Sequence, residues 1–405
     1  MPDTITDYNL EARGSLDACL KCTICETQCP VMAVTPLFPG PKFAGPQAER
    51  YRYGQSVDKS VDYCSSCGTC TLVCPQGVKI AEMNAAARAV LKAQHMPLRD
   101  QLISRTTLMG KAMRPVAPLA NAVLGFGPAR VAMEKVIGIH RNAAMPTARG
   151  RTFASWWKKH TPAGAPTRGK VVFFHGCAGQ YFEVATSVMT VEVLEHIGYE
   201  VVVPKQGCCG LALQSNGLFE AATAYVTTLA EQLGVEPGVP IVASAASCAG
   251  MLKHEAREIM GVDDPVVAAA GARMRDVCEF LLDLAEAGDL PGFAPLKLTV
   301  PYHAPCQLKS QGMGKPALEL LRLIPDLEVI DAEATCCGIA GTYGFKKEKY
   351  DIAMAVGKPL FDKVKEINPN LAVCDTETCR WQIAKATGAE VVHPIRLIHQ
   401  AYGLG

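Results

Sequence analysis

The sequence predicts a multidomain protein of the α+β and α/β classes, with a helical N-terminal domain followed by two tandem α/β modules with parallel sheets. Three observations predict this organisation. Eight of the eighteen cysteines fall in two short runs near the N-terminus. From Gly169 onward, buried-strand runs alternate with helical segments, which is typical of parallel sheets. A further cysteine pattern occurs twice in that region and indicates an internal repeat.

Cys19 begins a first run of the form C-x2-C-x2-C-x3-C-P, and Cys64 begins a second run with the same spacing. Runs of this form bind [4Fe–4S] clusters in bacterial ferredoxins, where the fourth cysteine ligates the other cluster. We therefore predict a ferredoxin-like domain at residues 1–95 with two [4Fe–4S] clusters. The expected ligands are Cys19, Cys22, Cys25 and Cys74 for the first cluster, and Cys64, Cys67, Cys70 and Cys29 for the second.

Zinc knuckles are the alternative interpretation, because all-cysteine zinc sites also use C-x2-C pairs. Zinc usually takes two separated pairs, and it does not explain why the fourth cysteine and the proline recur in both runs. Residues 1–18 contain four acidic residues and no apolar signal-peptide core. We therefore expect metal binding in a reducing, cytoplasmic location and no disulfide framework.

Residues 96–165 are expected to form a basic amphipathic helical segment. Between Met96 and His160 there are eleven Lys/Arg and two acidic residues, a local charge of +9 in a chain of net charge +1. Val116, Leu119 and Val123 lie on one face of a predicted helix. The longest uncharged run of this segment has 15 residues, fewer than the roughly 20 apolar residues that a membrane-spanning helix needs. The segment either lies peripherally on a membrane or packs against a partner subunit or the chain's own domains. No nucleic-acid partner is expected, because no binding motif accompanies the charge.

Two α/β modules are predicted, at residues 166–290 and 291–405. In the first module we expect strands at 170–174, 199–204 and 240–245 and helices at 183–197, 218–233 and 272–285. In the second module we expect strands at 296–302, 327–331 and 371–374 and helices at 316–324 and 348–365. Cys278, in the helix at 272–285, is expected to be a small buried hydrophobe.

Each module repeats one cysteine pattern, with a single cysteine, a Cys-Cys-Gly sequence and a last cysteine, each placed after a strand. The two copies are offset by 128 to 131 residues. Carboxyl ends of parallel strands meet at one edge of a sheet, where ligands bind. We therefore predict two four-thiol sites, namely Cys177, Cys208, Cys209 and Cys248 for a cluster or zinc, and Cys306, Cys336, Cys337 and Cys379 for a possible third cluster. His175 and His303 either ligate or tune these sites, or bond a loop carbonyl.

The modules resemble the cysteine-rich (CCG) domains of heterodisulfide reductases, of glycolate and lactate oxidase iron–sulfur subunits and, in particular, of the C subunits of anaerobic glycerol-3-phosphate dehydrogenases. The resemblance to the C subunits rests on the first cysteine run and on segments 38–50, 174–177, 336–348 and 377–383. It implies a non-catalytic electron-transfer subunit, peripheral on the cytoplasmic side of the inner membrane. Flavoprotein subunits carrying FAD would oxidise sn-glycerol 3-phosphate, and this chain would pass the electrons to a quinone.

The residues agree with that implication in one respect and depart from the family pattern in another. The sequence has no P-loop and no dinucleotide-binding glycine turn after a strand, so hydride chemistry is expected on another subunit. Heterodisulfide reductase modules end in C-x2-C, whereas Ala245 and Thr376 occupy that position here, which puts disulfide-reducing catalysis in doubt. The alternatives are the iron–sulfur subunit of a glycolate or lactate oxidase, a heterodisulfide-reductase-like thiol enzyme, and a zinc-stapled scaffold.

Overall fold

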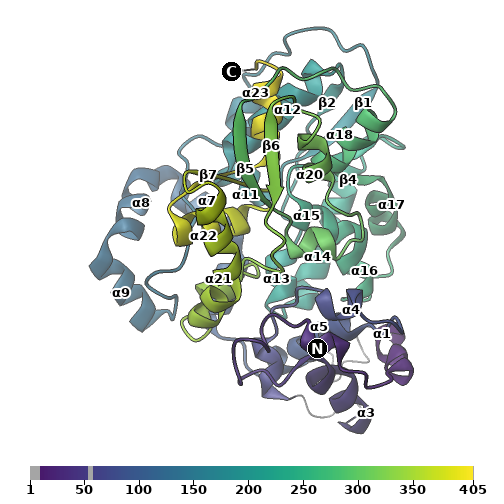
Figure 1. Cartoon of the computed structure of the whole chain (residues 1–405), viewed down its shortest axis with the longest axis vertical. Helices are drawn as coiled ribbons and strands as arrows, with labels where there is room; N and C mark the ends of the chain where they lie inside the picture. Colours follow the sequence, from purple (N-terminus) through teal and green to yellow (C-terminus); the bar gives the residue numbers. More distant parts are fainter. Residues whose placement is uncertain (1–9, 53–57, 405) are drawn as a thin grey trace.

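The computed structural model describes residues 10–52 and 58–404 (Figure 1). Its N-terminal unit is helical and lies below the two sheets in Figure 1. The unit's helices are α1 (Leu10–Gly14), α2 (Ile24–Thr27), α3 (Ala48–Arg52), α4 (Thr69–Leu72) and α5 (Ile80–Gln94). Short helices are expected here because the closely spaced cysteines and the Pro/Gly-rich loop interrupt regular structure. Residues 1–9 and 53–57 of the predicted domain lie outside the described residues.

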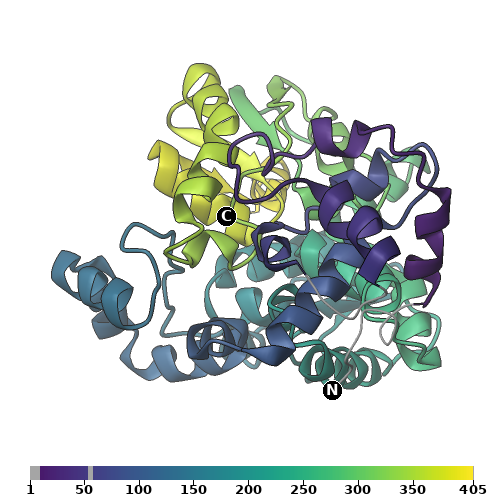
Figure 2. The ribbon, with the colours of Figure 1, turned by 90° about the horizontal axis from the view of Figure 1, so that it is seen from below.

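The basic segment forms an arm, which we define as residues 96–160. Its helices are α6 (Leu98–Ser104), α7 (Thr106–Met113), α8 (Ala117–Gly125), α9 (Gly127–Val136) and α10 (Phe153–Trp157). Helices α8 and α9 stand off to one side of the modules in both views (Figures 1 and 2). Among the described residues, no single helix is long and apolar enough to cross a bilayer. Taken together, the helical stretches 106–125 and 127–136 are long and apolar enough to cross a bilayer, but an 89° bend separates them.

The first module is a four-stranded parallel sheet covered by helices, with strand order β2-β1-β3-β4. Its strands are β1 (Lys170–Phe174), β2 (Glu200–Val202), β3 (Ile241–Ala243) and β4 (Met274–Asp276). Its helices are α11 (Gly176–Tyr181), α12 (Val184–His196), α13 (Leu211–Ser215), α14 (Phe219–Leu233), α15 (Ala246–Gly250), α16 (Ala256–Glu258), α17 (Pro265–Arg273) and α18 (Val277–Glu286). The strand order reverses at β1, so the carboxyl ends of β1 and β3 flank the crevice where ligands bind in such sheets.

The second module repeats this topology, with strand order β6-β5-β7-β8 and parallel pairing throughout. Its strands are β5 (Leu298–His303), β6 (Leu327–Asp331), β7 (Leu371–Cys374) and β8 (Glu390–Val392). Its helices are α19 (Cys306–Lys309), α20 (Pro316–Leu321), α21 (Tyr350–Ile367), α22 (Glu377–Thr387) and α23 (Pro394–Ala401). The predicted fold class and the internal repeat are thereby confirmed.

One predicted element is wrong. The helix expected at residues 272–285 does not begin until Val277, because residues 274–276 form β4 and pair with β3. Asp276 then caps α18, and its Oδ1 accepts a hydrogen bond from the Cys278 backbone N–H at 2.8 Å. A three-residue strand with a charged residue at its centre lacks the buried-strand pattern from which a strand is predicted. Cys278 is fully buried, as expected.

The two modules share one apolar core. Phe173 and Val242 of the first sheet belong to the same buried cluster as Tyr302 and Val373 of the second sheet. Helix α12 also packs on α23, and α18 on α20. Burying these apolar faces against each other favours a fixed relative placement of the modules.

A pair of buried carboxylates lies in this interface. Asp276 ends β4 and Asp375 follows β7, and both side chains are fully buried. Ligand atoms of Asp276, Asp375 and Cys278 lie within 4.8 Å of one another. Tyr302 donates a hydrogen bond to Asp375 at 2.8 Å. Burial, together with the neighbouring Asp375, raises the pKa of Asp276 to about 8, and burial raises the pKa of Asp375 to about 6.

These pKa values predict a pH-dependent stability. Because both folded pKa values exceed the usual unfolded value, the folded protein binds more protons above about pH 4, and the free energy of unfolding falls as pH rises toward 8. Asp276→Asn should keep the helix cap, because asparagine also caps helices. The variant should also lose less of its free energy of unfolding as the pH rises, a difference of about 2 kcal/mol from wild type at pH 8 to 9. Melting curves from pH 5 to 9 test this, with the exposed Asp263→Asn as control. Parallel curves for wild type and Asp276→Asn would contradict it.

Candidate functional site

The first predicted thiol group is assembled from both cysteine runs. Burial raises the pKa of the Cys25 thiol to about 11, helped by the charges of Glu26 and of the nearby Cys19, Cys74 and Cys22. Cys74, the last cysteine of the second run, therefore lies with the first three cysteines of the first run. In this group Cys22 is exposed and Cys25 is buried.

The second predicted thiol group shows the reciprocal crossing. Burial raises the pKa of Cys29 to about 12, with contributions from the Cys64 and Cys67 thiols. Burial also raises the pKa of Cys70, with contributions from Cys64, Cys67 and Cys29. The charge partners of Cys29 and Cys70 are thus the thiols that the crossed assignment groups with them, and the assignment of the eight cysteines to two clusters stays a prediction.

The backbone between these cysteines is tightly curled. Thr23 and Ser66 both occupy the left-handed region, with φ of 69° and 52°, and so does Gly68 at 77°. Non-glycine residues adopt this conformation rarely, and they do so mainly at turns and functional sites. The left-handed residues turn successive cysteine side chains toward a common centre.

The second thiol group abuts the second module. A Cβ on Gly68 would lie 2.8 Å from the Ser310 Cβ, so the chain approaches α19 closely at this glycine. Cys67 and Cys306 line one cavity. Burial and the Cys336 charge raise the pKa of Cys67. The N-terminal thiols are therefore adjacent to the thiols of the second module.

In the first module, the four predicted thiols come together from the first turn of α11, the loop after β2 and helix α15. The Cys177 and Cys208 sulfurs are 3.6 Å apart, and those of Cys209 and Cys248 are 3.5 Å apart. The arm adds Thr106, whose Oγ1 is 3.0 Å from the Cys177 sulfur. Sequence reasoning missed Thr106, because it is distant in the chain and belongs to no motif. The His175 Nδ1 is 2.7 Å from the Gly176 carbonyl oxygen, which fits the loop-carbonyl interpretation.

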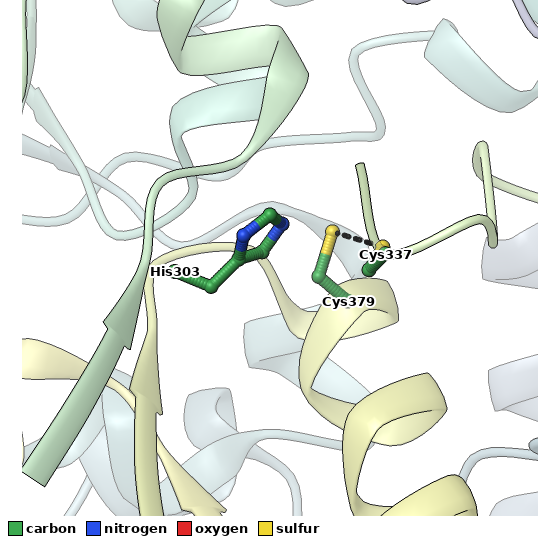
Figure 3. A group of neighbouring side chains, drawn as sticks. All are labelled: His303, Cys337 and Cys379. Carbon is green, nitrogen blue, oxygen red and sulfur yellow. Dashed lines mark hydrogen bonds between the residues drawn. The ribbon is translucent and has the colours of Figure 1, made fainter. Parts of the chain in front are cut away.

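In the second module, Cys337 and Cys379 have sulfurs 3.0 Å apart, and Cys336 is hydrogen-bonded to Cys306. His303 at the end of β5 lies beside the first pair, with ligand atoms of all three residues within 4.8 Å of one another (Figure 3). Burial lowers the pKa of His303 to about 4, so the imidazole is neutral at pH 7. Its Nε2 has no hydrogen-bond partner among the described residues. A neutral imidazole and thiols suit zinc or an iron–sulfur cluster.

The Cys-Cys-Gly sequence has the same role in both modules. The backbone N–H of Gly210 points to the Cys208 sulfur at 3.5 Å, and that of Gly338 to the Cys336 sulfur at 3.2 Å. Hydrogen bonds with Cys177, Cys209 and Gly210 lower the pKa of Cys208. Hydrogen bonds from Cys306, Cys337 and Gly338 do the same for Cys336. The first cysteine of each pair is therefore prepared to be a thiolate, the form that binds metal.

A central cavity of about 150 Å³ joins the two modules. The module thiols that line it are Cys177, Cys208, Cys209, Cys248, Cys306, Cys337 and Cys379. Ile103, Thr106 and Met109 of the arm line it too. Helix α7 is fixed in this place by close packing, because a Cβ on Gly110 would lie 2.5 Å from the Tyr181 ring. Cys374 and Cys278 are buried and do not line this cavity.

A buried ionic network lies beside Cys64, in a small cavity that Cys64 also lines. The Lys346 Nζ is 2.9 Å from Asp100, and the Lys349 and Lys92 Nζ atoms are each 3.0 Å from Asp62. Lys346 and Lys349 are 4% and 1% exposed. Lys346 belongs to the segment 336–348 on which the family resemblance rests, and the structure shows that this segment contacts the arm and the N-terminal unit.

Two family models match the chain, the 4Fe-4S dicluster domain over residues 15–78 and the cysteine-rich (CCG) domain over residues 171–253 and again over 300–384. Together with the thiol geometry, they define an iron–sulfur protein with two tandem cysteine-rich domains.

Relatives identify the family more closely. The chain is 37% identical to the C subunit of the anaerobic glycerol-3-phosphate dehydrogenase of Escherichia coli (strain K12), over 96% of this chain and 98% of that relative. It is 25% identical to the glycolate oxidase iron-sulfur subunit of the same organism, over 97% and 95%. It is 23% identical to the D subunit of a heterodisulfide reductase of Methanosarcina barkeri, over 96% and 94%. The chain belongs to the family of anaerobic glycerol-3-phosphate dehydrogenase C subunits, which confirms the resemblance.

Proposed function

We propose that this chain is the electron-transfer subunit of a quinone-reducing sn-glycerol-3-phosphate dehydrogenase. Flavoprotein subunits carrying FAD supply the electrons, and the chain passes them to the quinone pool. The observation that carries the proposal is that the second N-terminal thiol group adjoins the module thiols, since Cys67 and Cys306 line one cavity and Cys306 also lines the central cavity. Identity of 37% over nearly the whole chain favours this dehydrogenase over the glycolate oxidase alternative, at 25%.

Within this proposal, Cys19, Cys22, Cys25 and Cys74 hold one [4Fe–4S] cluster, and Cys64, Cys67, Cys70 and Cys29 hold the other. The two module sites hold a further cluster or zinc. Bound clusters accept and release single electrons, as a relay between a two-electron flavin and a quinone requires. Cys22 and its exposed neighbours Leu20 and Ile24, 68% and 41% exposed, offer the flavoprotein a contact surface at the entry end.

The crossed ligand sets predict which cysteine variants behave alike. Cys74→Ser should abolish the same EPR signal of the dithionite-reduced protein as Cys22→Ser, although Cys74 lies in the other run. Cys29→Ser should match Cys67→Ser. Each variant should lose up to four of about eight N-terminal irons per chain. Iron and sulfide analysis with EPR, on anaerobically purified protein, measures this. Cys278→Ala is the control and should keep all the iron. Pairing of Cys74 with Cys67 instead would show that the ligands do not cross.

The flavoprotein that co-purifies with this chain tests whether the substrate is sn-glycerol 3-phosphate. Purification of the complex from its source should yield a flavoprotein that reduces the chain's clusters on addition of sn-glycerol 3-phosphate. Glycolate or lactate should give no reduction under the same conditions. Bleaching of the cluster absorbance measures the transfer. Reduction by glycolate alone would support the oxidase alternative, and zinc without iron would end the electron-transfer proposal.

We also propose that the arm holds the chain peripherally on the cytoplasmic side of the inner membrane. At its tip Leu119, Val123 and Phe126 are 64%, 48% and 61% exposed. At its base Ile103 and Ile139 are buried in the core of the second module, so that part packs on the chain's own domains. Exposed apolar side chains on a basic, bent helix pair match an interfacial membrane segment.

Exposed valines provide a matched test of membrane contact. Val123→Glu, at the arm's tip, should weaken binding to anionic phospholipid vesicles about tenfold, because a charge replaces a side chain that enters the interface. Val266→Glu, at a site with 42% exposure on α17, should leave binding unchanged. Co-sedimentation with vesicles measures both variants. An equal loss, or no loss, would contradict a role for the arm.

A further inference from the structure

One arginine of the N-terminal unit is buried against the second cysteine run. Arg88 lies on α5 and is 5% exposed. Its Nη1 donates to the Cys64 carbonyl oxygen at 2.8 Å, and its Nη2 donates to the Ser66 hydroxyl oxygen at 2.7 Å. The backbone N–H of Ser66 in turn points to the Cys64 sulfur at 3.4 Å. The guanidinium therefore holds the loop between Cys64 and Cys67, two predicted ligands of the second thiol group.

The charge of this guanidinium is not paired within the described part of the chain. Both of its hydrogen-bond acceptors there are uncharged, and its Nε is buried without a partner. Burial raises the pKa of the nearby Glu255 to about 7, so this carboxyl carries only part of a negative charge at pH 7. A buried charge is costly unless an opposite charge compensates it. The uncompensated cation therefore points to an anionic group beside it, which four thiolates around iron would supply.

The lysines of the buried ionic network are less constant sources of positive charge. Lys346 and Lys349 line the same small cavity as Arg88. Burial, together with the charge of Lys346, lowers the pKa of Lys349 to about 7, and burial lowers the pKa of Lys346. Each of these lysines is also paired with a carboxylate of the network. A guanidinium stays protonated in proteins. Arg88 is therefore the constant positive charge at the second thiol group.

We infer that Arg88 raises the reduction potential of the [4Fe–4S] cluster proposed for the second thiol group. This inference rests on the proposed electron-transfer function and adds the residue that tunes one step of it. That step is a one-electron transfer from the reduced flavoprotein, in which no covalent bond forms or breaks and the thiol-bound group gains one negative charge. A permanent cation in the protein interior stabilises the more negative form. Arg88 thus favours residence of the electron on the thiol group that adjoins the second module.

A redox titration followed by EPR measures this effect on anaerobically purified, full-length protein. The relevant signal is the one that Cys67→Ser removes. Arg88→Gln keeps an amide donor but loses the charge, so it should make reduction about tenfold less favourable, which lowers the midpoint by about 59 mV for a one-electron couple. Arg88→Lys keeps the charge and should retain most of the wild-type midpoint. The signal that Cys22→Ser removes should shift less in both Arg88 variants, because the charge effect falls with distance.

Arg130→Gln is the matched control. Arg130 is also buried, at 7% exposure, and it donates to the backbone carbonyls of Arg141 and Ala143 at 2.8 and 2.7 Å. It lies on α9 of the arm, which stands off to one side of the modules (Figure 1). This variant should leave both midpoints unchanged. Iron and sulfide content, measured on the same samples, should equal that of the wild type in all three arginine variants.

The possible results separate failure of this inference from failure of the proposed function. A wild-type midpoint in Arg88→Gln would overturn the inference and leave the proposed function standing. An equal fall of the midpoint in Arg88→Lys would also overturn it, because the charge would then not be the cause. Loss of about four irons from both Arg88 variants would show a purely structural role. Wild-type protein that gives no EPR signal after dithionite reduction would refute the proposed function itself.

Discussion

One buried ionic network joins all four parts of the chain. Lys346 and Lys349 extend from the second module, Lys92 and Asp62 belong to the N-terminal unit, and Asp100 belongs to the arm. Lys346 also donates to Asn216 of the first module at 2.7 Å. Burying these charges is costly, and the cost is offset only when every partner is in place. The network therefore favours the docking geometry in which Cys67 lies beside Cys306, together with the apolar core that the modules share.

Sheet topology explains why the module thiols converge. In each module the strand order reverses at the first strand, so the carboxyl ends of β1 and β3, or of β5 and β7, open onto one crevice. Cys177 and Cys248 follow the first pair of strands, and Cys306 and Cys379 follow the second. The shared apolar core turns the two crevices toward a common cavity. A single module would supply four thiols at a sheet edge; two packed modules enclose them.

Strong local patterns predicted the elements well. The strands at 170–174, 327–331 and 371–374 match the structure to the residue, and two of them, 170–174 and 371–374, are largely buried. β4 and β8, two three-residue strands at sheet edges, were not predicted. Cysteine spacing was enough to predict the module thiols whose sulfurs lie close together. Thr106 and Lys349 reach their sites through tertiary packing, and no periodicity or spacing around them signals the contact.

Solvent exposure differs among the thiols, and each N-terminal group and each module contains both buried and less buried ones. Cys22 is exposed, Cys67 is partly buried, and Cys209 and Cys337 are buried. Water near a cluster and hydrogen bonds to its sulfurs both change its reduction potential. The thiols therefore have different surroundings. Cys22 is exposed, and Cys64 lines a cavity with Lys349. The module thiols lie near backbone N–H groups and the Thr106 hydroxyl. On the proposed function, the exposed Cys22 makes one thiol group accessible to a protein partner, while the buried Cys209 and Cys337 lie away from water.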